Sequence, residues 1–173
     1  MLGHPVTGRS VAVVPFEPRF QDDVLELIVS IQREEFGIDI TAAQQPDLRS
    51  IPGFYQTGLG NFWVAQGGGR VVGTISLLDI GNRQAALRKM FVDRDFRGAS
   101  PGTAAHLLDT LLAWAETRGI REIYLGTTEK FLAAHRFYAK HGFEEIAKSA
   151  LPPAFPIMEV DTRFFRRRIE PAR

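Results

Sequence analysis

The chain has 173 residues, which is enough for one α/β domain with its own core and too few for two ordinary domains. Its composition, 45% hydrophobic and 24% charged, is that of a soluble globular protein, and a net charge of +1 excludes a molecule built as a whole to bind nucleic acid or anionic lipid. The absence of cysteine excludes disulfides, thiol nucleophiles and cysteine-based metal sites.

The sequence predicts a cytoplasmic location. Residues 1–15 carry no basic segment followed by a sustained apolar run, so no secretory signal is expected. No apolar run approaches the roughly 20 residues that span a bilayer, and we therefore expect no membrane partner. Residues 1–9 are predicted to form a flexible leader, 10–168 a single domain and 169–173 a tail. Both a monomer and a homodimer are compatible with this sequence.

The first third of the chain predicts a strand, a helix and a long loop. Residues 11–16 are a short apolar run typical of a strand. Apolar residues then recur at helical spacing from Val24 to Ile31, and Gly37 is expected to end that helix. The stretch 38–60 is rich in Gln, Pro and Gly and reads as a loop with room for one short helix.

Three strands and the strongest helix are expected next. Residues 61–66 and 71–78 are β-rich and are joined by three glycines, which predicts a hairpin, and 85–92 is a further strand. Residues 100–118 carry one apolar stripe at helical spacing. Ser100 is the expected N-cap of this helix, with Pro101 at its first position and Gly119 at its end.

The last part of the chain predicts a strand, a helix and two more strands. Residues 121–125 alternate between apolar and polar side chains, as in a strand. Residues 130–141 are expected to form a helix that Gly142 closes. The final strands are predicted at 143–147 and 157–165, with a proline-rich loop between them.

The segment 90–103 carries the clearest chemical signal. It runs from a predicted strand through a short loop into the N-terminus of the strongest helix, where unpaired backbone N–H groups and the helix dipole favour an anion. Gly98 and Gly102 allow the backbone to approach a phosphate closely, and Arg97 adds a cation. These residues favour a phosphate-binding loop, and a plain glycine turn before a helix remains the alternative.

Two common phosphate motifs are excluded here. A P-loop needs a lysine after its last glycine, whereas Thr103 follows Gly102. The dinucleotide fingerprint G-x-G-x-x-G is absent from the chain.

Together with a second motif, this loop resembles that of the GNAT superfamily of N-acetyltransferases. Members of the superfamily have a strand, a loop of the form [Q/R]-x-x-G-x-[G/A], and a later helix that carries an Ala, the pair [F/L]-Y and then G-F. Residues 134–143, AHRFYAKHGF, match the second motif. The resemblance covers 60–148 well and the rest only by the order of elements. It implies one α/β domain with a mixed, mostly antiparallel sheet, flanked by helices and splayed to hold an acyl-coenzyme A.

The resemblance also implies roles for particular residues. Tyr138 would be the general acid that protonates the departing thiolate. The strand before the loop would pair its backbone with the pantetheine arm of acetyl-CoA, and the loop would hold the diphosphate. The residues expected to bind the coenzyme are Met90, Phe91, Val92, Arg97, Gly98, Ala99, Ser100, Pro101, Gly102 and Thr103.

The chain departs from the family pattern at several positions. Ser100 stands where the family usually has Gly, and Phe131 where many members have an Asn that contacts the coenzyme. The glutamate that some members use as general base is also missing, because Ala86 and Gly126 occupy its two usual positions. Glu129, Glu35 or a water chain could take its place, and the residues alone do not choose among them.

Other polar residues carry simpler interpretations. Tyr138 could be a core tyrosine instead of an acid. His106, His135 and His141 lie on predicted helices without the spacing of a metal site, so no metal is expected. The basic run 166–168 is expected to be a solvated strand end or tail, and no nucleic-acid partner is expected.

We therefore predict an N-acyltransferase that moves an acetyl group from acetyl-CoA directly to a primary amine of a small molecule or peptide. A non-catalytic coenzyme A-binding or sensor domain is the alternative. The acceptor is expected to lie near 34–55, with Glu35 and Tyr55 as binding residues. The acidic residues of this segment would favour a cationic amine, although a solvated helix end is the slightly better explanation of them.

Overall fold

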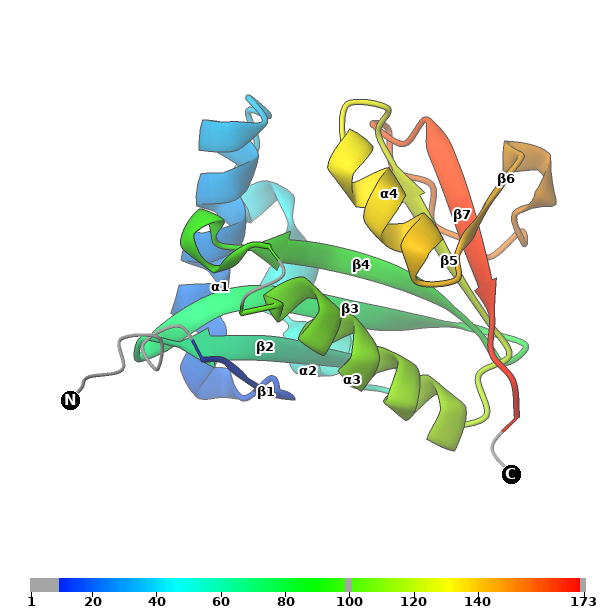
Figure 1. Cartoon of the computed structure of the whole chain (residues 1–173), viewed down its shortest axis with the longest axis horizontal. Helices are drawn as coiled ribbons and strands as arrows, with labels where there is room; N and C mark the ends of the chain where they lie inside the picture. Colours follow the sequence, from blue (N-terminus) through cyan, green and yellow to red (C-terminus); the bar gives the residue numbers. More distant parts are fainter. Residues whose placement is uncertain (1–9, 99–100, 172–173) are drawn as a thin grey trace.

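A seven-stranded sheet runs through the molecule and carries the helices on both sides (Figure 1). The computed structural model describes residues 10–98 and 101–171. The strand order is β1-β2-β3-β4-β5-β7-β6, and neighbouring strands are antiparallel except β4 and β5, which are parallel. The strands are β1 (Ala12–Pro15), β2 (Asn61–Gly67), β3 (Arg70–Gly81), β4 (Gln84–Val92), β5 (Glu122–Thr127), β6 (Glu144–Ile146) and β7 (Arg163–Arg168).

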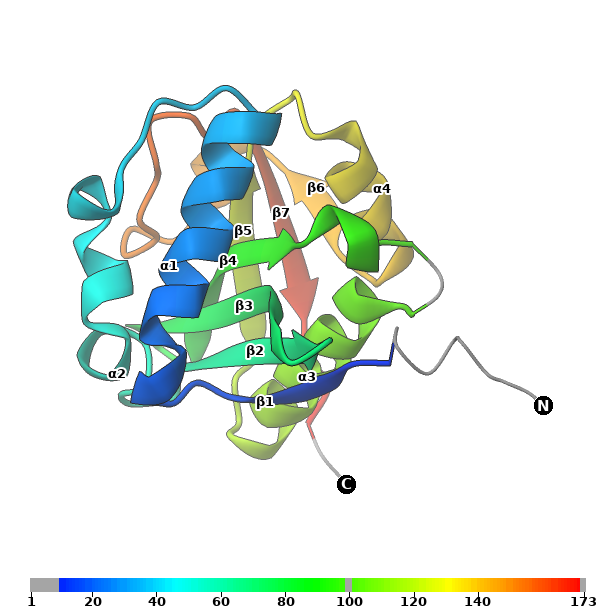
Figure 2. The same ribbon diagram turned by 90° about the vertical axis from the view of Figure 1, so that its left-hand side faces the viewer.

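The helices divide between the two faces of this sheet (Figure 2). α1 and α2 cover one face, whereas α3 and α4 cover the other. The helices are α1 (Gln21–Ser30), α2 (Ile51–Phe54), α3 (Thr103–Thr117) and α4 (Leu132–Lys140). The shorter helical turns are η2 (Pro18–Phe20), η3 (Ile31–Glu35), η4 (Ala42–Gln44), η5 (Pro46–Arg49), η6 (Arg94–Phe96) and η7 (Lys148–Ala150).

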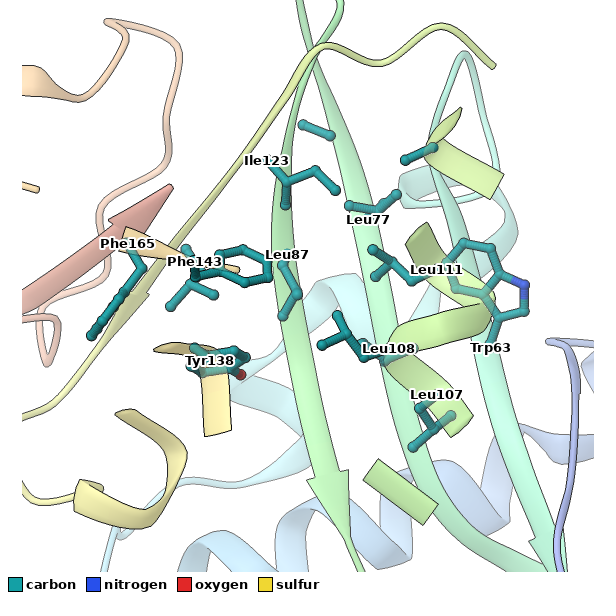
Figure 3. Close-up of a cluster of buried hydrophobic side chains, with 14 of the residues drawn as sticks. Trp63, Leu77, Leu87, Leu107, Leu108, Leu111, Ile123, Tyr138, Phe143 and Phe165 are labelled. Carbon is teal, nitrogen blue, oxygen red and sulfur yellow. The ribbon is translucent and has the colours of Figure 1, made fainter. Parts of the chain in front are cut away.

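Period-two alternation along β2 separates two hydrophobic clusters. Trp63 and Ala65 point to the α3 side, whereas Phe62 and Val64 point to the α1 side. Both sides of the sheet are therefore buried, which explains why β2 reads as a nearly continuous apolar run. Figure 3 shows the larger cluster, whose labelled members are Trp63, Leu77, Leu87, Leu107, Leu108, Leu111, Ile123, Tyr138, Phe143 and Phe165.

Tight turns connect the three long strands in the order in which they occur in the sequence. The predicted hairpin between β2 and β3 is confirmed, and its turn residues Gly68 and Gly69 have φ of 58° and 77°. The β3–β4 turn uses Asn82 and Arg83 with φ of 54° and 59°. Positive φ at both central residues is the signature of a type I′ turn, whose twist matches that of a hairpin.

The predicted start of the strongest helix is wrong. α3 begins at Thr103, and its N-cap is Gly102, with φ of 72°. Ser100, which was expected to cap the helix, lies outside the described residues. Gly102 takes the cap position because the chain enters the helix through a left-handed conformation that a residue with a Cβ rarely adopts.

The predicted bounds of the last strand are also wrong, because the strand is Arg163–Arg168 and does not begin at Ile157. Residues 157–160 are exposed, and a hydrogen bond from the Asp161 amide to the Met158 carbonyl (3.0 Å) closes a turn there. β7 lies between β5 and β6, so that Phe164 and Phe165 are both buried, on opposite faces.

The predicted fold class is confirmed: one α/β domain with a mixed, mostly antiparallel sheet flanked by helices. Among the described residues, no helix is both long enough and apolar enough to cross a membrane.

We expect Leu108→Ala to lower the free energy of unfolding by about 3 kcal/mol, because it removes a fully buried side chain between α3 and the sheet. Leu132→Ala is the matched control, since Leu132 is 56% exposed and its loss should change stability by less than about 0.5 kcal/mol. Urea denaturation of both variants measures the difference. Equal effects would show that the α3 packing is misassigned.

Candidate active site

A split between two strands forms the centre of the candidate site. β4 and β5 pair only where 84–86 meets 122–124. Beyond that point β4 continues to Val92 and β5 to Thr127, and the described residues of the two strands make no further pairs. The backbone groups along the inner edges of both strands are therefore available to a molecule that enters between them.

A β-bulge shapes the β4 side of this split. In the register with β3, Thr74 faces Phe91 while Ser76 faces Arg88, so β4 carries one residue more than β3 between these pairs. Lys89 sits at the bulge with φ of 57°, a left-handed conformation that is uncommon for a residue with a side chain. The Thr74 and Ser76 hydroxyls donate to the Lys89 and Arg88 carbonyls, each at 2.7 Å, and hold the bulge in place.

The Lys89 ammonium enters a buried polar cluster on the α1 side of the sheet. It donates to Gln45 Oε1 at 2.9 Å and lies 3.5 Å from the Asp47 carboxylate, which also accepts the Tyr55 hydroxyl at 2.6 Å. Gln45 and Gln32 exchange a pair of amide hydrogen bonds. Burial lowers the pKa of Lys89, and Asp47 opposes that shift.

The neighbouring Arg88 is placed differently. Its guanidinium lies 5.8 Å from the Phe54 ring and 5.9 Å from the Tyr55 ring, and it donates to the Met158 sulfur at 3.6 Å. No carboxylate of the described residues forms an ion pair with it. Arg88 therefore presents a charge to the α1 side of the split, between α2 and the turn that precedes β7.

The β5 side of the split carries a carboxylate from elsewhere in the chain. A Cβ added to Gly126 would lie 2.5 Å from Asp161 Oδ2, so the Asp161 carboxyl group occupies the space that a side chain at 126 would fill. The Met158 amide donates to the same oxygen at 3.0 Å. Burial raises the pKa of Asp161, which opposes the influence of Met158 and of Arg88 across the split.

Tyr138 lies on the opposite face of the sheet from Asp161. It packs in the α3-side cluster against Phe143 and Phe165, with ring centroids 5.5 and 6.2 Å apart (Figure 3). Burial raises the pKa of Tyr138 above its usual value, so the phenol stays protonated throughout the physiological range. No described group hydrogen-bonds its hydroxyl. Tyr138 is thus a core side chain whose hydroxyl has no hydrogen-bond partner among the described residues.

The predicted phosphate loop starts where β4 ends. Arg97 donates through Nε to the Val92 carbonyl at 2.8 Å and pairs with Glu35 at 2.7 Å. Gly98 has φ of 96°. The Thr103 hydroxyl is buried at the first turn of α3 and has no hydrogen-bond partner among the described residues. An unsatisfied buried hydroxyl at a helix N-terminus indicates a place for a further acceptor.

Met90, Phe91 and Val92 lie on β4 beyond its last pair with β5, and the predicted loop follows β4 in the chain, with Arg97 and Gly98 before the described part breaks off and Pro101, Gly102 and Thr103 at the start of α3. Of the loop residues, Ala99 and Ser100 lie outside the described part of the chain, so their predicted contacts are not tested.

The predicted acceptor residues have protein partners. Glu35 is bound to Arg97 of the loop. Tyr55 is fully buried, and its hydroxyl donates a hydrogen bond to Asp47. It therefore has no free polar group with which to bind an acceptor. Phe131, at the family's Asn position, contacts Phe36 with ring centroids 4.2 Å apart and thereby joins the segment after α1 to the start of α4.

Sequence reasoning missed Asp161 altogether. It was assigned to the interior of a strand, and no local motif marks it. Glu129, one of the alternatives for the general base, is exposed. The described residues contain no group of three or more His, Asp or Glu side chains that could hold a metal ion.

Comparison with known proteins identifies the family to which this fold belongs, with its splayed strands, its bulge and its glycine loop before α3. The model of the "Acetyltransferase (GNAT) family" matches residues 25–143. The chain belongs to the GNAT family of acetyltransferases, as its sequence motifs predicted.

Among solved structures, an acetyltransferase of the GNAT family from Staphylococcus aureus is 37% identical. The match covers 93% of this chain and 100% of that chain, with a TM-score of 0.87.

Curated relatives carry related names. A mouse "Probable N-acetyltransferase family 8 member 5" is 29% identical, over 72% of this chain and 56% of the relative. The N-acetylaspartate synthetase of Xenopus tropicalis is 34% identical, over 62% of this chain and 40% of the relative. The chain thus spans about half the length of the curated relatives that it matches.

Two isosteric substitutions should change stability in opposite directions. Thr74→Val removes the donor to the Lys89 carbonyl and should lower the free energy of unfolding by about 1–3 kcal/mol. Thr103→Val removes a buried hydroxyl without a described partner and should raise it by about 1 kcal/mol. Denaturant unfolding of the ligand-free protein tests both. Destabilisation of similar size in both variants would contradict the assignment of Thr103 as unsatisfied.

Proposed function

We propose that this protein transfers an acetyl group from acetyl-CoA to a primary amine, directly and without a covalent enzyme intermediate. The observation that carries this proposal is the β4–β5 split, which opens beside the glycine loop at the start of α3. A thioester held in the split and an amine held on the α1 side would be close enough to react. Holding the two reactants together would supply much of the rate.

The coenzyme site follows from the β4 edge and the loop. The backbone of Met90 to Val92 lies beyond the last pair with β5 and would bind the amides of a pantetheine arm as an added strand does, although the Val92 carbonyl already accepts from Arg97. The diphosphate would lie at the N-terminus of α3, where Gly98 and Gly102 keep the backbone open and the Thr103 hydroxyl lacks a partner.

Arg97 is the cation of this phosphate site. In the ligand-free protein its charge is compensated by Glu35. A bound diphosphate would compete with Glu35 for the guanidinium, so coenzyme binding and the position of η3 would be coupled. Glu35 would therefore influence acceptor binding in two ways, through its own negative charge and through its ion pair with Arg97.

Tyr138 is the proposed general acid. Its pKa is raised by burial, so it remains a phenol and can donate a proton to the thiolate that leaves. The position of Tyr138 on the α3 side, opposite Asp161, would allow the thiol to depart on one face while the amine arrives on the other.

The acceptor class stays a prediction. The acidic segment 34–55 favours a cationic amine, but Glu35 and Asp47 are paired with Arg97 and Lys89, which weakens the negative potential that the segment presents. Some curated relatives are N-acetylaspartate synthetases, whose name refers to an acidic acceptor. A screen of polyamines, amino acids, acidic amino acids and peptides with free-thiol detection separates these classes.

The reaction suits the cytoplasmic location that the sequence predicts, and nucleic-acid binding is not part of the proposal. A homodimer remains a prediction. A non-catalytic coenzyme A-binding domain is the other outcome of the acceptor screen: it would bind acetyl-CoA and acetylate no amine.

We expect Tyr138→Phe to lower kcat by roughly tenfold to a thousandfold and to leave acetyl-CoA affinity nearly unchanged, because only a proton donor is lost. The same variant should unfold at the wild-type denaturant concentration, since no described group hydrogen-bonds the hydroxyl. Steady-state turnover with calorimetric acetyl-CoA titration measures both effects. Turnover at the wild-type rate at every pH would leave Tyr138 as packing only.

A further inference from the structure

The register of β4 with β5 shows which residues of the two strands lie opposite each other where the split begins. β4 and β5 last pair where Ala86 meets Tyr124, and both side chains belong to a cluster on the α1 side of the sheet. Two residues further along each strand, the same face carries Arg88 on β4 and Gly126 on β5. Across the opening, a guanidinium therefore faces a position without a side chain.

The Asp161 carboxyl group fills that empty position. Its Oδ2 and Cγ would lie 2.5 and 2.7 Å from a Cβ on Gly126. Gly126 has an ordinary backbone conformation, so the constraint on this position is the space that Asp161 occupies. Gly126 on β5 has no side chain, and the carboxylate of Asp161, from the turn before β7, lies in its place.

The surroundings of Asp161 leave part of the carboxylate unused. Oδ2 accepts the Met158 amide at 3.0 Å, and no described group hydrogen-bonds Oδ1. From β4, Arg88 is the charged side chain that acts on it. On its own segment, Glu159 is exposed, and Arg163 is turned away to Glu145 and His135.

Amine acetylation needs such a group. An alkylammonium, with a reference pKa of about 10.4, is almost wholly protonated at neutral pH and must lose a proton before its nitrogen can attack. The half-buried Asp161 carboxylate is more basic than an ordinary aspartate, because burial raises its pKa. Glu35 and Glu129 are less suitable as bases, since Glu35 is bound to Arg97 and Glu129 is exposed.

We propose that Asp161 is the general base that accepts the proton of the acceptor amine, in the position that a side chain at Gly126 would otherwise occupy. This inference rests on the proposed acetyl transfer. It adds a catalytic residue supplied from the turn between η7 and β7.

The protons and bonds of this step balance. Asp161 takes one proton from the ammonium, which gives a neutral amine and a carboxylic acid that returns its proton to solvent. The amine nitrogen attacks the thioester carbonyl carbon, the C–S bond breaks, and the thiolate takes a proton from Tyr138. The second proton lost from nitrogen restores the phenol. The net products are the amide, coenzyme A and one proton.

The test compares Asp161→Asn with Glu159→Gln, a matched loss of an exposed carboxylate from the same turn. For Asp161→Asn we expect kcat/KM for the best amine of the acceptor screen to fall by about a hundredfold or more near neutral pH. The loss should shrink as pH approaches the amine pKa, because the free amine then needs no base. Acetyl-CoA affinity, measured by calorimetry, should stay within about twofold of wild type, and Glu159→Gln should behave as wild type.

A transplanted carboxylate separates catalysis from structure. Asp161→Gly combined with Gly126→Asp moves the carboxylate onto β5, and removing the Asp161 side chain clears the space that it needs. We expect kcat/KM for the amine to be at least tenfold higher in this double variant than in Asp161→Gly alone. Its pH dependence should also return to that of the wild type.

The possible outcomes separate a failure of the Asp161 inference from a failure of the proposed function. An Asp161→Asn protein with the wild-type rate and pH profile would overturn the inference and leave the proposed function standing. The inference would also be overturned, with the proposed function left standing, if Asp161→Asn lowered the rate equally at every pH and the double variant did not restore it. A wild-type protein that binds acetyl-CoA but acetylates no amine would overturn the proposed function, and the inference with it.

Discussion

The separation of β4 from β5 is the constraint on which the rest of the site depends. The two strands pair in parallel only as far as Ala86 and Tyr124. Beyond this point the two strands do not pair with each other, so backbone groups along their inner edges, other than the Val92 carbonyl that accepts from Arg97, are available to a ligand. The bulge at Lys89, held by Thr74 and Ser76, fixes the direction in which β4 leaves. The strained backbone at Lys89 is held by two part-buried hydrogen bonds, and such strain is typical of functional positions.

Charge pairing connects the parts that surround the split. The Glu35–Arg97 pair joins the end of η3 to the loop before α3, and the Lys89–Asp47 pair joins the bulge to η5. Both pairs are intramolecular and leave little free charge, whereas Arg88 and Asp161 face each other without a direct ion pair. The groups assigned to proton transfer thus lie outside the compensated pairs, with Tyr138 on one face of the sheet and Asp161 on the other.

The sequence predicts the features that depend on neighbouring residues. The Tyr138 helix and the glycine loop are local patterns of spacing and turn chemistry, and together they predicted the family and the splayed sheet. The start of α3 was mispredicted because Ser100 and Pro101 have good capping composition, while Gly102 supplies the conformation that is used. Asp161 was missed because its partner position on β5 lies far upstream, and a missing side chain at Gly126 carries no signal of what fills it.

The proposed place of acetyl-CoA in the split between β4 and β5 can be tested by amide hydrogen exchange followed by mass spectrometry, with and without the coenzyme. We expect acetyl-CoA to slow exchange in the segments that contain 90–92 and 101–106 and to leave the edge strand β1 unchanged. Protection confined to the outer edges of the sheet, or no protection at saturating acetyl-CoA, would show that the coenzyme does not bind in the split.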